Sequence, residues 1–336
     1  MTASGNEPRL ADVAARAGVS VATVSRVLNN RGYLSRDTRD RVAHAIADLG
    51  YRPNQVARAL LGRRTRTVGL IVPSVALPFF GEVAVAVENA LAEQGFRLLL
   101  CNSLGRADRE RDHLDLLLAN RVEGIISGAH NDPLTEYQAV EMPLVTIDRE
   151  LAPHIPNVRS ANVSGGRLAT EHLLHRGAKQ PALLTSRSRP QNLREQGYRE
   201  VLTEAGIVPE IMAVDFHTPE DERFQRITTW LDAAQGRVDA VFATDDLMAA
   251  TVLEWAHRAG RQVPEDFKVV GFDGTLAVRR ALPGLTTIQQ PIDAICREAV
   301  ELLLRQIEGR VTGQALDQNP LALVELPVTL VPGWTT

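Results

Sequence analysis

A short run near the start of the chain limits how that part can fold. From residue 15 to residue 29 it reads ARAGVSVATVSRVLN, with small residues where two helices would touch. Gly18 stands where a left-handed residue would end one helix, and Ser20 is a suitable N-cap for the next. The run therefore predicts two short helices joined by a tight turn.

Apolar residues on both sides of this turn recur at helical spacing. They are Leu10, Val13, Ala14 and Ala17 before the turn, Val24, Val27 and Leu28 after it, and Val42, Ile46 and Leu49 in a third helix that Ser35 and Thr38 open. The second helix would then present Val21, Ala22, Ser25 and Arg26 to solvent. This pattern fits either a plain helical bundle or a helix-turn-helix whose second helix enters the major groove of DNA.

The charge of this region favours the DNA-binding alternative. Residues 1–66 hold 12 arginines and 5 acidic residues, a net charge of +7. The remaining 270 residues hold 25 basic and 36 acidic residues, a net charge of −11. A basic unit joined to an acidic body is typical of a module that binds a polyanion.

Beyond about residue 66, short β-rich segments alternate with helical ones. Strands are expected at 68–72, 96–101, 124–127, 144–147, 182–184, 211–214, 239–242 and 268–271, and helices at 80–94, 109–118, 162–175 and 192–205. This alternation predicts an α/β fold with doubly wound parallel sheets. Such sheets bind ligands beyond the carboxyl ends of their strands. The polar residues at those ends are therefore candidates: Asp148, Arg149, Asp245, Asp246, Asp273, Gln289 and Gln290.

Composition and motifs argue against several other classes of protein. Cys101 and Cys296 are far apart and lie in apolar stretches, so we expect buried thiols and neither a disulfide framework nor a metal site. The first residues show no hydrophobic signal region, and no apolar run reaches the roughly 18 residues of a membrane span, so a cytoplasmic location is expected. No phosphate loop, GxGxxG or GxSxG motif is present. We expect no cofactor, no metal and no enzymatic activity.

Many short segments, in order along the whole chain, resemble the LacI/GalR family of bacterial transcription regulators. They include LADVA at 10–14, AGVS at 17–20, TVSRVLN at 23–29, LGYRPN at 49–54, VGL at 68–70, PFF at 78–80, VEG at 122–124, IDR at 147–149, VGFD at 270–273 and LTTI at 285–288. The resemblance implies an all-α helix-turn-helix domain at 1–52, a hinge helix and linker at 53–65, and an effector-binding and dimerisation domain at 66–336. That last domain resembles a two-lobed periplasmic-binding-protein-like domain. Its lobes are expected at about 66–160 with 291–322 and 161–290 with 323–336.

The resemblance also assigns contacts with operator DNA. The matching residues are Ser20, Val21, Ala22, Thr23, Ser25, Arg26, Asn29, Tyr51, Asn54, Ala57 and Leu60. Val21 and Ala22 are small and apolar, so they could only make van der Waals contacts, for example with a thymine methyl group. Arg26 is either a bidentate guanine contact or a phosphate contact. Leu60 is either a wedge inserted in the minor groove or a packing residue against the effector domain.

A second set of residues matches the ligand positions of the family. It consists of Phe79, Phe80, Asp148, Arg149, Arg194, Phe216, Asp245, Asp273 and Gln290. Carboxylates and arginines can bind adjacent hydroxyls of a neutral sugar, a pentose or a hexose, and aromatic rings can flank it. Leu77 stands where ribose-type members usually have asparagine. One phenylalanine could instead be a core residue, and Asp245 and Asp246 could instead be helix N-terminal charges.

These assignments together imply a homodimer that binds a pseudo-palindromic operator and releases it when a sugar binds between the lobes. The sugar would shift the lobes and separate the paired hinge helices. Two alternatives stay open: a sugar-binding protein without a transcriptional role, and a corepressor-dependent regulator of non-sugar metabolism. Neither a membrane nor a cofactor is an expected partner.

Overall fold

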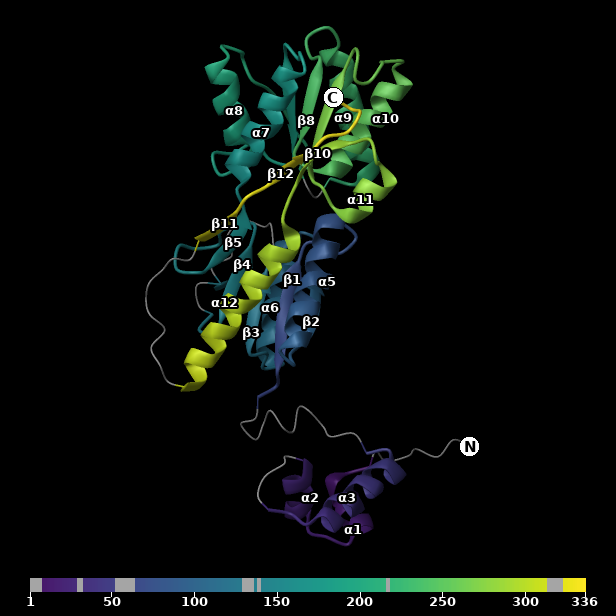
Figure 1. Cartoon of the computed structure of the whole chain (residues 1–336), viewed down its shortest axis with the longest axis vertical. Coiled ribbons are helices and arrows are strands. Elements are labelled where there is room, and N and C mark those ends of the chain that lie inside the picture. Colours follow the sequence, from purple (N-terminus) through teal and green to yellow (C-terminus); the bar gives the residue numbers. More distant parts are fainter. Residues whose placement is uncertain are drawn as a thin grey trace. The chain divides into compact units, whose positions relative to one another are not determined.

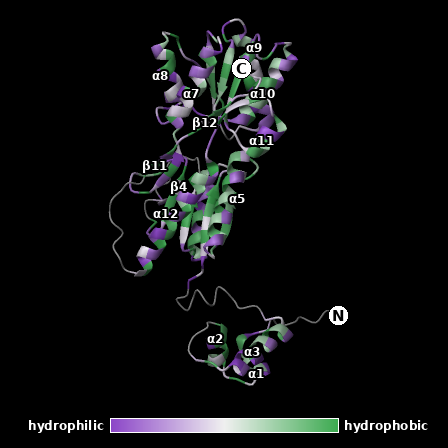
Figure 2. Cartoon of the chain, in the orientation of Figure 1, coloured by the Kyte–Doolittle hydropathy of each residue, from purple (hydrophilic) through white to green (hydrophobic). Residues whose placement is uncertain are grey.

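The computed structural model describes residues 8–28, 33–51, 64–128, 136–137, 140–215, 218–312 and 323–336. The chain divides into two compact units, residues 1–65 and residues 66–336 (Figure 1). Apolar residues gather on the strands and on the inner faces of the helices in the second unit, while the outer faces of its helices are largely hydrophilic (Figure 2).

The described part of the first unit contains three helices, α1 (Leu10–Ala17), α2 (Val21–Leu28) and α3 (Arg36–Leu49). Gly18 ends α1 in the left-handed conformation, with φ of 65°. Ser20 Oγ accepts the N–H of Thr23 (3.1 Å) before α2, and Ser35 Oγ accepts the N–H of Thr38 (3.2 Å) before α3. The buried core comprises Val13, Ala14, Ala17, Val24, Val42 and Ala45. The predicted helix, turn and helix are confirmed.

The second unit has two lobes, each built on a six-stranded sheet. The first sheet has the order β11-β5-β4-β3-β1-β2 and is parallel throughout. The second has the order β12-β10-β9-β8-β6-β7 and is parallel except for β12. Their bounds are β1 (Thr67–Val72), β2 (Arg97–Asn102), β3 (Gly124–Ser127), β4 (Leu144–Ile147), β5 (Asn157–Ser160) and β11 (Leu323–Leu326), then β6 (Pro181–Thr185), β7 (Glu210–Ala213), β8 (Ala240–Ala243), β9 (Lys268–Asp273), β10 (Thr286–Gln289) and β12 (Thr329–Val331). The expected doubly wound α/β fold is confirmed.

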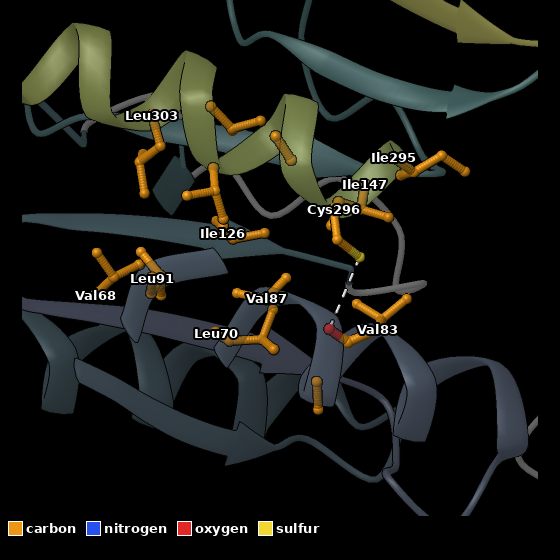
Figure 3. Close-up of a cluster of buried hydrophobic side chains, with 14 of the residues drawn as sticks. Val68, Leu70, Val83, Val87, Leu91, Ile126, Ile147, Ile295, Cys296 and Leu303 are labelled. Carbon is orange, nitrogen blue, oxygen red and sulfur yellow. Dashed lines mark hydrogen bonds between the residues drawn. The ribbon is translucent and has the colours of Figure 1, made fainter. Parts of the chain in front are cut away.

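Helices cover both faces of the first sheet. Helices α5 (Pro78–Glu93) and α12 (Ile292–Thr312) pack on one face and α6 (Ala107–Ala119) on the other. Figure 3 shows α12 directing Cys296 toward the α5 backbone, where its thiol donates to the carbonyl of Val83 (3.8 Å). Burial raises the pKa of Cys296 to about 12. Both cysteines are buried, free thiols, as expected.

The second sheet is covered in the same way. Helices α7 (Asn162–His175) and α8 (Leu193–Glu204) pack on one face, and α9 (Glu220–Ala234) and α10 (Asp246–Arg258) pack on the other. A short helix, α11 (Leu276–Ala281), follows β9. The parallel strands of each sheet reach their carboxyl ends on the side of the other lobe, which is where a ligand site is expected in such sheets.

The chain crosses between the lobes three times: between β5 and α7, between β10 and α12, and between β11 and β12. The third crossing differs from the expected boundary. Residues 323–326 pair with β5 and so belong to the first lobe, whereas the sequence-based division placed them in the second. Strands β5, β10, β11 and β12 are also absent from the expected strands.

Two glycines let α7 and α8 approach closely. A Cβ at Gly197 would lie 2.1 Å from the carbonyl oxygen of Val163, and one at Gly166 would lie 2.2 Å from that of Arg194. Both obstacles are backbone atoms, which cannot swing aside as a flexible side chain would. The close helix pair therefore fixes the position of Arg194 at the start of α8.

We expect Gly197→Ala to lower the stability of the protein by about 1–3 kcal/mol or more, because overpacking forces the two backbones apart. Urea unfolding measures this loss as a lower midpoint. Gln196→Ala, a change at an exposed neighbour on the same helix, serves as the control. Equal midpoints for the two variants would show that the helices can separate at no cost.

Candidate functional site

A cavity of about 790 Å³ lies between the two lobes of the second unit. Its walls come from residues within 77–80 and 148–153 of the first lobe and within 185–194, 244–248 and 273–278 of the second. These segments follow the carboxyl ends of strands in both sheets. The volume is within the range of about 300–1,000 Å³ that is typical of small-molecule sites.

Arg194 is the centre of the polar network in this cavity. Its Nε donates to Oδ1 of Asn162 (2.8 Å), and its Nη1 donates to the carbonyl oxygen of Thr244 (2.5 Å). Nη1 also lies 3.4 Å from Oδ1 of Asp273, and Nη2 lies 3.9 Å from Oδ1 of Asp148. One guanidinium group thus connects carboxylates from both lobes.

The guanidinium of Arg194 also stacks on an aromatic ring. Its Cζ lies 3.7 Å from the centroid of the Phe272 ring, a cation–π contact that fixes the plane of the group. Asp148 and Asp273 both have positive φ values, 67° and 109°. L-residues rarely adopt this region, and such strained positions cluster at ligand sites where the surrounding contacts maintain them.

The network continues into two of the segments that cross between the lobes. Asn162 Nδ2 donates to Oδ1 of Asp148 (3.2 Å), and Gln290 Nε2 donates to Oδ1 of Asp273 (2.7 Å). Ser160 Oγ in turn donates to Oε1 of Gln290 (2.6 Å). Gln290 is only 3% exposed and is not among the residues that line the cavity. From this buried position outside the cavity lining, Gln290 holds the carboxylate of Asp273 and connects the two crossing segments.

Asp245 and Asp246 lie at the start of α10, and both line the cavity. Asp245 caps the helix by accepting the N–H of Met248 (2.7 Å). This agrees with the alternative that Asp245 is a helix N-terminal charge. Asp246 accepts the N–H of Gly274 (2.8 Å) and the hydroxyl of Thr287 (2.5 Å). A Cβ at position 271 would lie 2.4 Å from Oδ1 of Asp246, so glycine there makes room for the carboxyl group.

Desolvation raises the pKa values of several carboxyl groups here. For Asp246 burial raises the pKa to about 7, against the lowering effect of the Thr287 hydroxyl and the Gly274 N–H. Burial also raises the pKa of Asp245 and that of Asp273, although the charge of Arg194 lowers both. Asp148, Asp245, Asp246 and Asp273 form what we call the floor of the cavity. This floor therefore carries less negative charge near neutral pH than four ionised aspartates would.

The raised pKa of Asp246 predicts how stability varies with pH. In the unfolded chain the carboxyl loses its proton near pH 4, whereas in the folded protein it keeps the proton until about pH 7. Because the folded state binds more protons in this interval, stability falls as pH rises from about 4 to about 7 and then levels. Asp246→Asn, which stays neutral, should flatten this decline.

Urea midpoints at pH 5 and pH 8 measure this effect. Relative to the wild type, the Asp246→Asn variant should gain more stability at pH 8 than at pH 5. Asp221→Asn, at an exposed position of α9, controls for the loss of one carboxylate. Parallel pH profiles for wild type and Asp246→Asn would show that Asp246 is ionised in the folded protein.

Phe79 and Phe80 combine the two roles that the sequence left open. They are 6% and 5% exposed and belong to the core of the first lobe, yet both also line the cavity. Their rings meet edge to face at 5.0 Å. Leu77, which precedes α5, lines the cavity as well, and so does Arg149. Phe216 is outside the described residues.

Sequence reasoning missed several residues of the cavity. They are Asn162, Arg187, Arg189, Asn192, Arg223 and Thr244. A signal for two of them was present, because Asn162 and Asn192 are short polar residues at the beginnings of helices that follow strands. Asn192 caps α8, whereas α7 has no side-chain cap. The arginines gave no such signal, since arginine supplies nearly all the basic residues of this chain.

In the first unit, α2 presents an accessible face. Val21 is 45% exposed, and Ala22 and Arg26 are also exposed, as expected for a recognition helix. Ser25 is half-buried, and the hydroxyls of Ser20 and Thr23 share a hydrogen bond (2.9 Å). Tyr51 packs against the core of the unit. Asn29, Asn54, Ala57 and Leu60 are outside the described residues, as is most of the expected hinge segment.

Two other kinds of site are not found in the described part of the chain. No cluster of three or more histidine, cysteine or acidic side chains is arranged to hold a metal ion there. None of the helices described is long and apolar enough to cross a membrane.

Both units match models of known families. The model for bacterial regulatory proteins of the lacI family matches residues 9–54, and the model for periplasmic binding protein-like domains matches residues 170–336. The sucrose operon repressor of Pediococcus pentosaceus is 40% identical over 98% of this chain and 99% of its own length. The ribose operon repressor of Halalkalibacterium halodurans is 38% identical over 93% of this chain and 94% of its own length.

Solved structures of related proteins also match this chain over nearly its whole length. A lac repressor dimer bound to operator and the anti-inducer ONPF has a TM-score of 0.82 at 29% identity and covers 98% of this chain and 99% of its own. A complex of the transcriptional regulator CelR with cellobiose has a TM-score of 0.69 at 31% identity, covering 98% of this chain and 100% of its own. The helix-turn-helix unit, the two-lobed α/β unit and these full-length matches show that the chain belongs to the lacI family of bacterial regulatory proteins.

Proposed function

We propose that this protein represses carbohydrate-utilisation genes and that a small sugar bound between its lobes controls its binding to operator DNA. The observation that carries the proposal is the polar network around Arg194 in the inter-lobe cavity, in a chain that also contains a basic helix-turn-helix unit. Relatives matched over nearly the whole chain are named as sucrose and ribose operon repressors, which supports the same function.

The chemistry of the cavity suits a pentose or a hexose. Asp148, Arg194 and Asp273 offer acceptors and donors side by side, and adjacent hydroxyls of a sugar can satisfy both kinds of group. Hydrogen bonds to charged groups are stronger than neutral ones. Phe79 and Phe80 supply apolar surface for the C–H face of the sugar ring. Binding without turnover needs no nucleophile, so this proposal assigns the protein no enzymatic activity.

Contacts between the lobes allow a bound sugar to influence how the lobes are arranged. Glu82 on α5 accepts the N–H of Leu276 at the start of α11 (2.6 Å), which joins the lobes directly. The contact between Ser160 and Gln290 joins two of the crossing segments. A sugar that binds one arrangement of the lobes more tightly than the other shifts the equilibrium between them. Residues 53–65, with Ala57 and Leu60 as minor-groove contacts, are proposed as the hinge that transmits the shift.

The protein is also proposed to act as a homodimer. Apolar side chains are exposed at the β2 edge of the first sheet: Val85 on α5, Leu100 on β2, Leu104 after it and Leu116 on α6. Exposed apolar residues on neighbouring elements are typical of a surface that another protein covers. Two copies related by a two-fold axis would match the symmetry of a pseudo-palindromic operator.

A thermal-shift screen of pentoses and hexoses tests the proposed effector class directly. At saturating concentration a sugar that binds the folded protein raises its melting temperature, because the ligand stabilises only the folded state. At least one sugar should produce such a rise, and DNA-binding assays are then repeated with that sugar. If no sugar stabilises the protein, the proposed effector class is wrong.

Arg26→Ala is expected to lower operator affinity by about tenfold or more, since a bidentate contact to guanine contributes about 1–3 kcal/mol of discrimination. Fluorescence anisotropy with operator and with unrelated DNA of equal length separates the two roles left open for this residue. Arg258→Ala, at an exposed position in the second unit, is the matched control. An equal loss of affinity for both DNAs would identify Arg26 as a phosphate contact instead.

A further inference from the structure

The lining of the inter-lobe cavity contains two sets of charged residues. Around Arg194, the floor carries four aspartates, at positions 148, 245, 246 and 273. The rest of the lining includes several arginines: Arg187 and Arg189 come from the loop before α8, Arg223 from α9, and Arg149 and Arg159 from the first lobe. Apart from the floor aspartates, Glu150 is the one acidic residue among the described lining residues.

An ion pair and hydrogen bonds hold the loop that carries Arg187 and Arg189. Arg187 Nε donates to Oδ2 of Asp215 (2.9 Å), and the side chain of Arg187 is 26% exposed. Asn192 fixes the loop by donating through Nδ2 to the carbonyl oxygen of Arg187 (2.8 Å) and to Oγ1 of Thr185 (2.9 Å). The same residue caps α8. The loop that carries Arg187 and Arg189 is therefore held in one conformation.

Arg223 connects the wall to the floor. Its Nη2 donates to the carbonyl oxygen of Thr218 (3.2 Å), and its side chain is 15% exposed. The charge of Arg223 also lowers the pKa of Asp245, against the larger effect of desolvation. Arg223 therefore lies close enough to Asp245 to act on its charge, and it lines the same cavity as Arg187 and Arg189.

Gathering arginines on the wall of one cavity costs energy through mutual repulsion, and an anion between them offsets that cost. Asp215 and Glu220, which form ion pairs with Arg187 and Arg223, are not among the described residues that line the cavity. A guanidinium group has five N–H donors in a planar fork that matches a phosphate or a carboxylate. The cavity volume leaves room beside a single sugar ring for such a substituent.

We propose that the wall formed by Arg187, Arg189 and Arg223 is a subsite for an anionic substituent on the sugar whose hydroxyl groups bind the floor. The effector is then a saccharide that carries a phosphate ester or a carboxylate. This inference rests on the proposed function, which places a sugar in the cavity. The opposing structural role is that Arg187 only fastens its loop to Asp215, which follows β7.

Calorimetric titration of the full-length protein with matched pairs of ligands tests the subsite. The pairs are ribose and ribose 5-phosphate, fructose and fructose 6-phosphate, glucose and glucose 6-phosphate, and glucose and glucuronate, so that phosphate and carboxylate are distinguished. At least one anionic member should bind about tenfold or more tighter than its neutral parent, as expected for charge-assisted bonds. The Arg187→Gln/Arg189→Gln double variant should lose this preference and retain its affinity for the neutral parent.

Arg258→Gln, which changes an exposed arginine outside the cavity, is the control for net charge, and melting curves verify folding of each variant. Equal or tighter binding of the neutral member in every pair overturns the anionic subsite and leaves the sugar proposal intact. A preference for the anionic member that persists in the double variant also overturns it. Failure of both members of every pair to bind overturns the sugar proposal, and this inference with it.

Discussion

Arg194→Met is expected to abolish the response to the effector while operator binding persists. Within the described residues, Arg194 is the cation that pairs with both Asp148 and Asp273, and it also orients Asn162. Each hydrogen bond to a charged group contributes about 1.5–3 kcal/mol, so losing two or more should weaken effector binding by about 100-fold or more. The DNA-binding unit is a separate compact unit and should keep its affinity.

Titration calorimetry measures the loss of effector binding, and fluorescence anisotropy measures operator affinity. Arg167→Met is the matched control, because Arg167 forms ion pairs with Glu171, Glu200 and Glu204 on the outer surface of α7 and α8. The Arg194→Lys variant keeps the charge but loses the planar fork, and its intermediate affinity would show that geometry matters. If Arg194→Met binds the effector as Arg167→Met does, the network does not form the sugar site.

Gln290→Met is expected to weaken effector binding by about tenfold and to lower stability by about 1–3 kcal/mol, because it leaves buried polar groups of Ser160 and Asp273 without their present bonds. Gln290 acts through Asp273 in this structure, so its effect should depend on that carboxylate. A double-mutant cycle with Asp273→Asn measures the dependence. Strictly additive effects of the two substitutions on effector affinity would instead support a direct contact between Gln290 and the sugar.

The elements that could be predicted were those set by local patterns. Gly18 and Ser20 marked the turn between the first two helices because a left-handed residue and a cap are needed at those points. The strands were recognised where apolar or β-branched residues run uninterrupted, as in Leu144–Ile147. Strand β5 was missed because its sequence, Asn-Val-Arg-Ser, has neither a continuous apolar run nor a strong β-branched content.

The candidate site could be predicted only as a set of strand ends. Asp148 and Asp273 do come together in the cavity, because the carboxyl ends of the parallel strands in the two lobes border it, and Arg194 reaches both from the start of α8. Which side chains face the ligand space could not be read from sequence. Burial of Gln290 behind Asp273 depends on where the chain crosses between the lobes, and the arginines of the wall lie on loops whose course has no periodic signal.

Operator affinity of the full-length protein, measured with and without a sugar that stabilises it, tests the central claim most directly. DNA selected by the protein from a random pool serves as the operator, and fluorescence anisotropy gives the dissociation constant at physiological ionic strength. The sugar should weaken operator binding by about 5–150-fold, the usual range of allosteric coupling, and Arg194→Met should show no change. A sugar that binds the wild-type protein but leaves its operator affinity unchanged, or raises it, would contradict sugar-relieved repression.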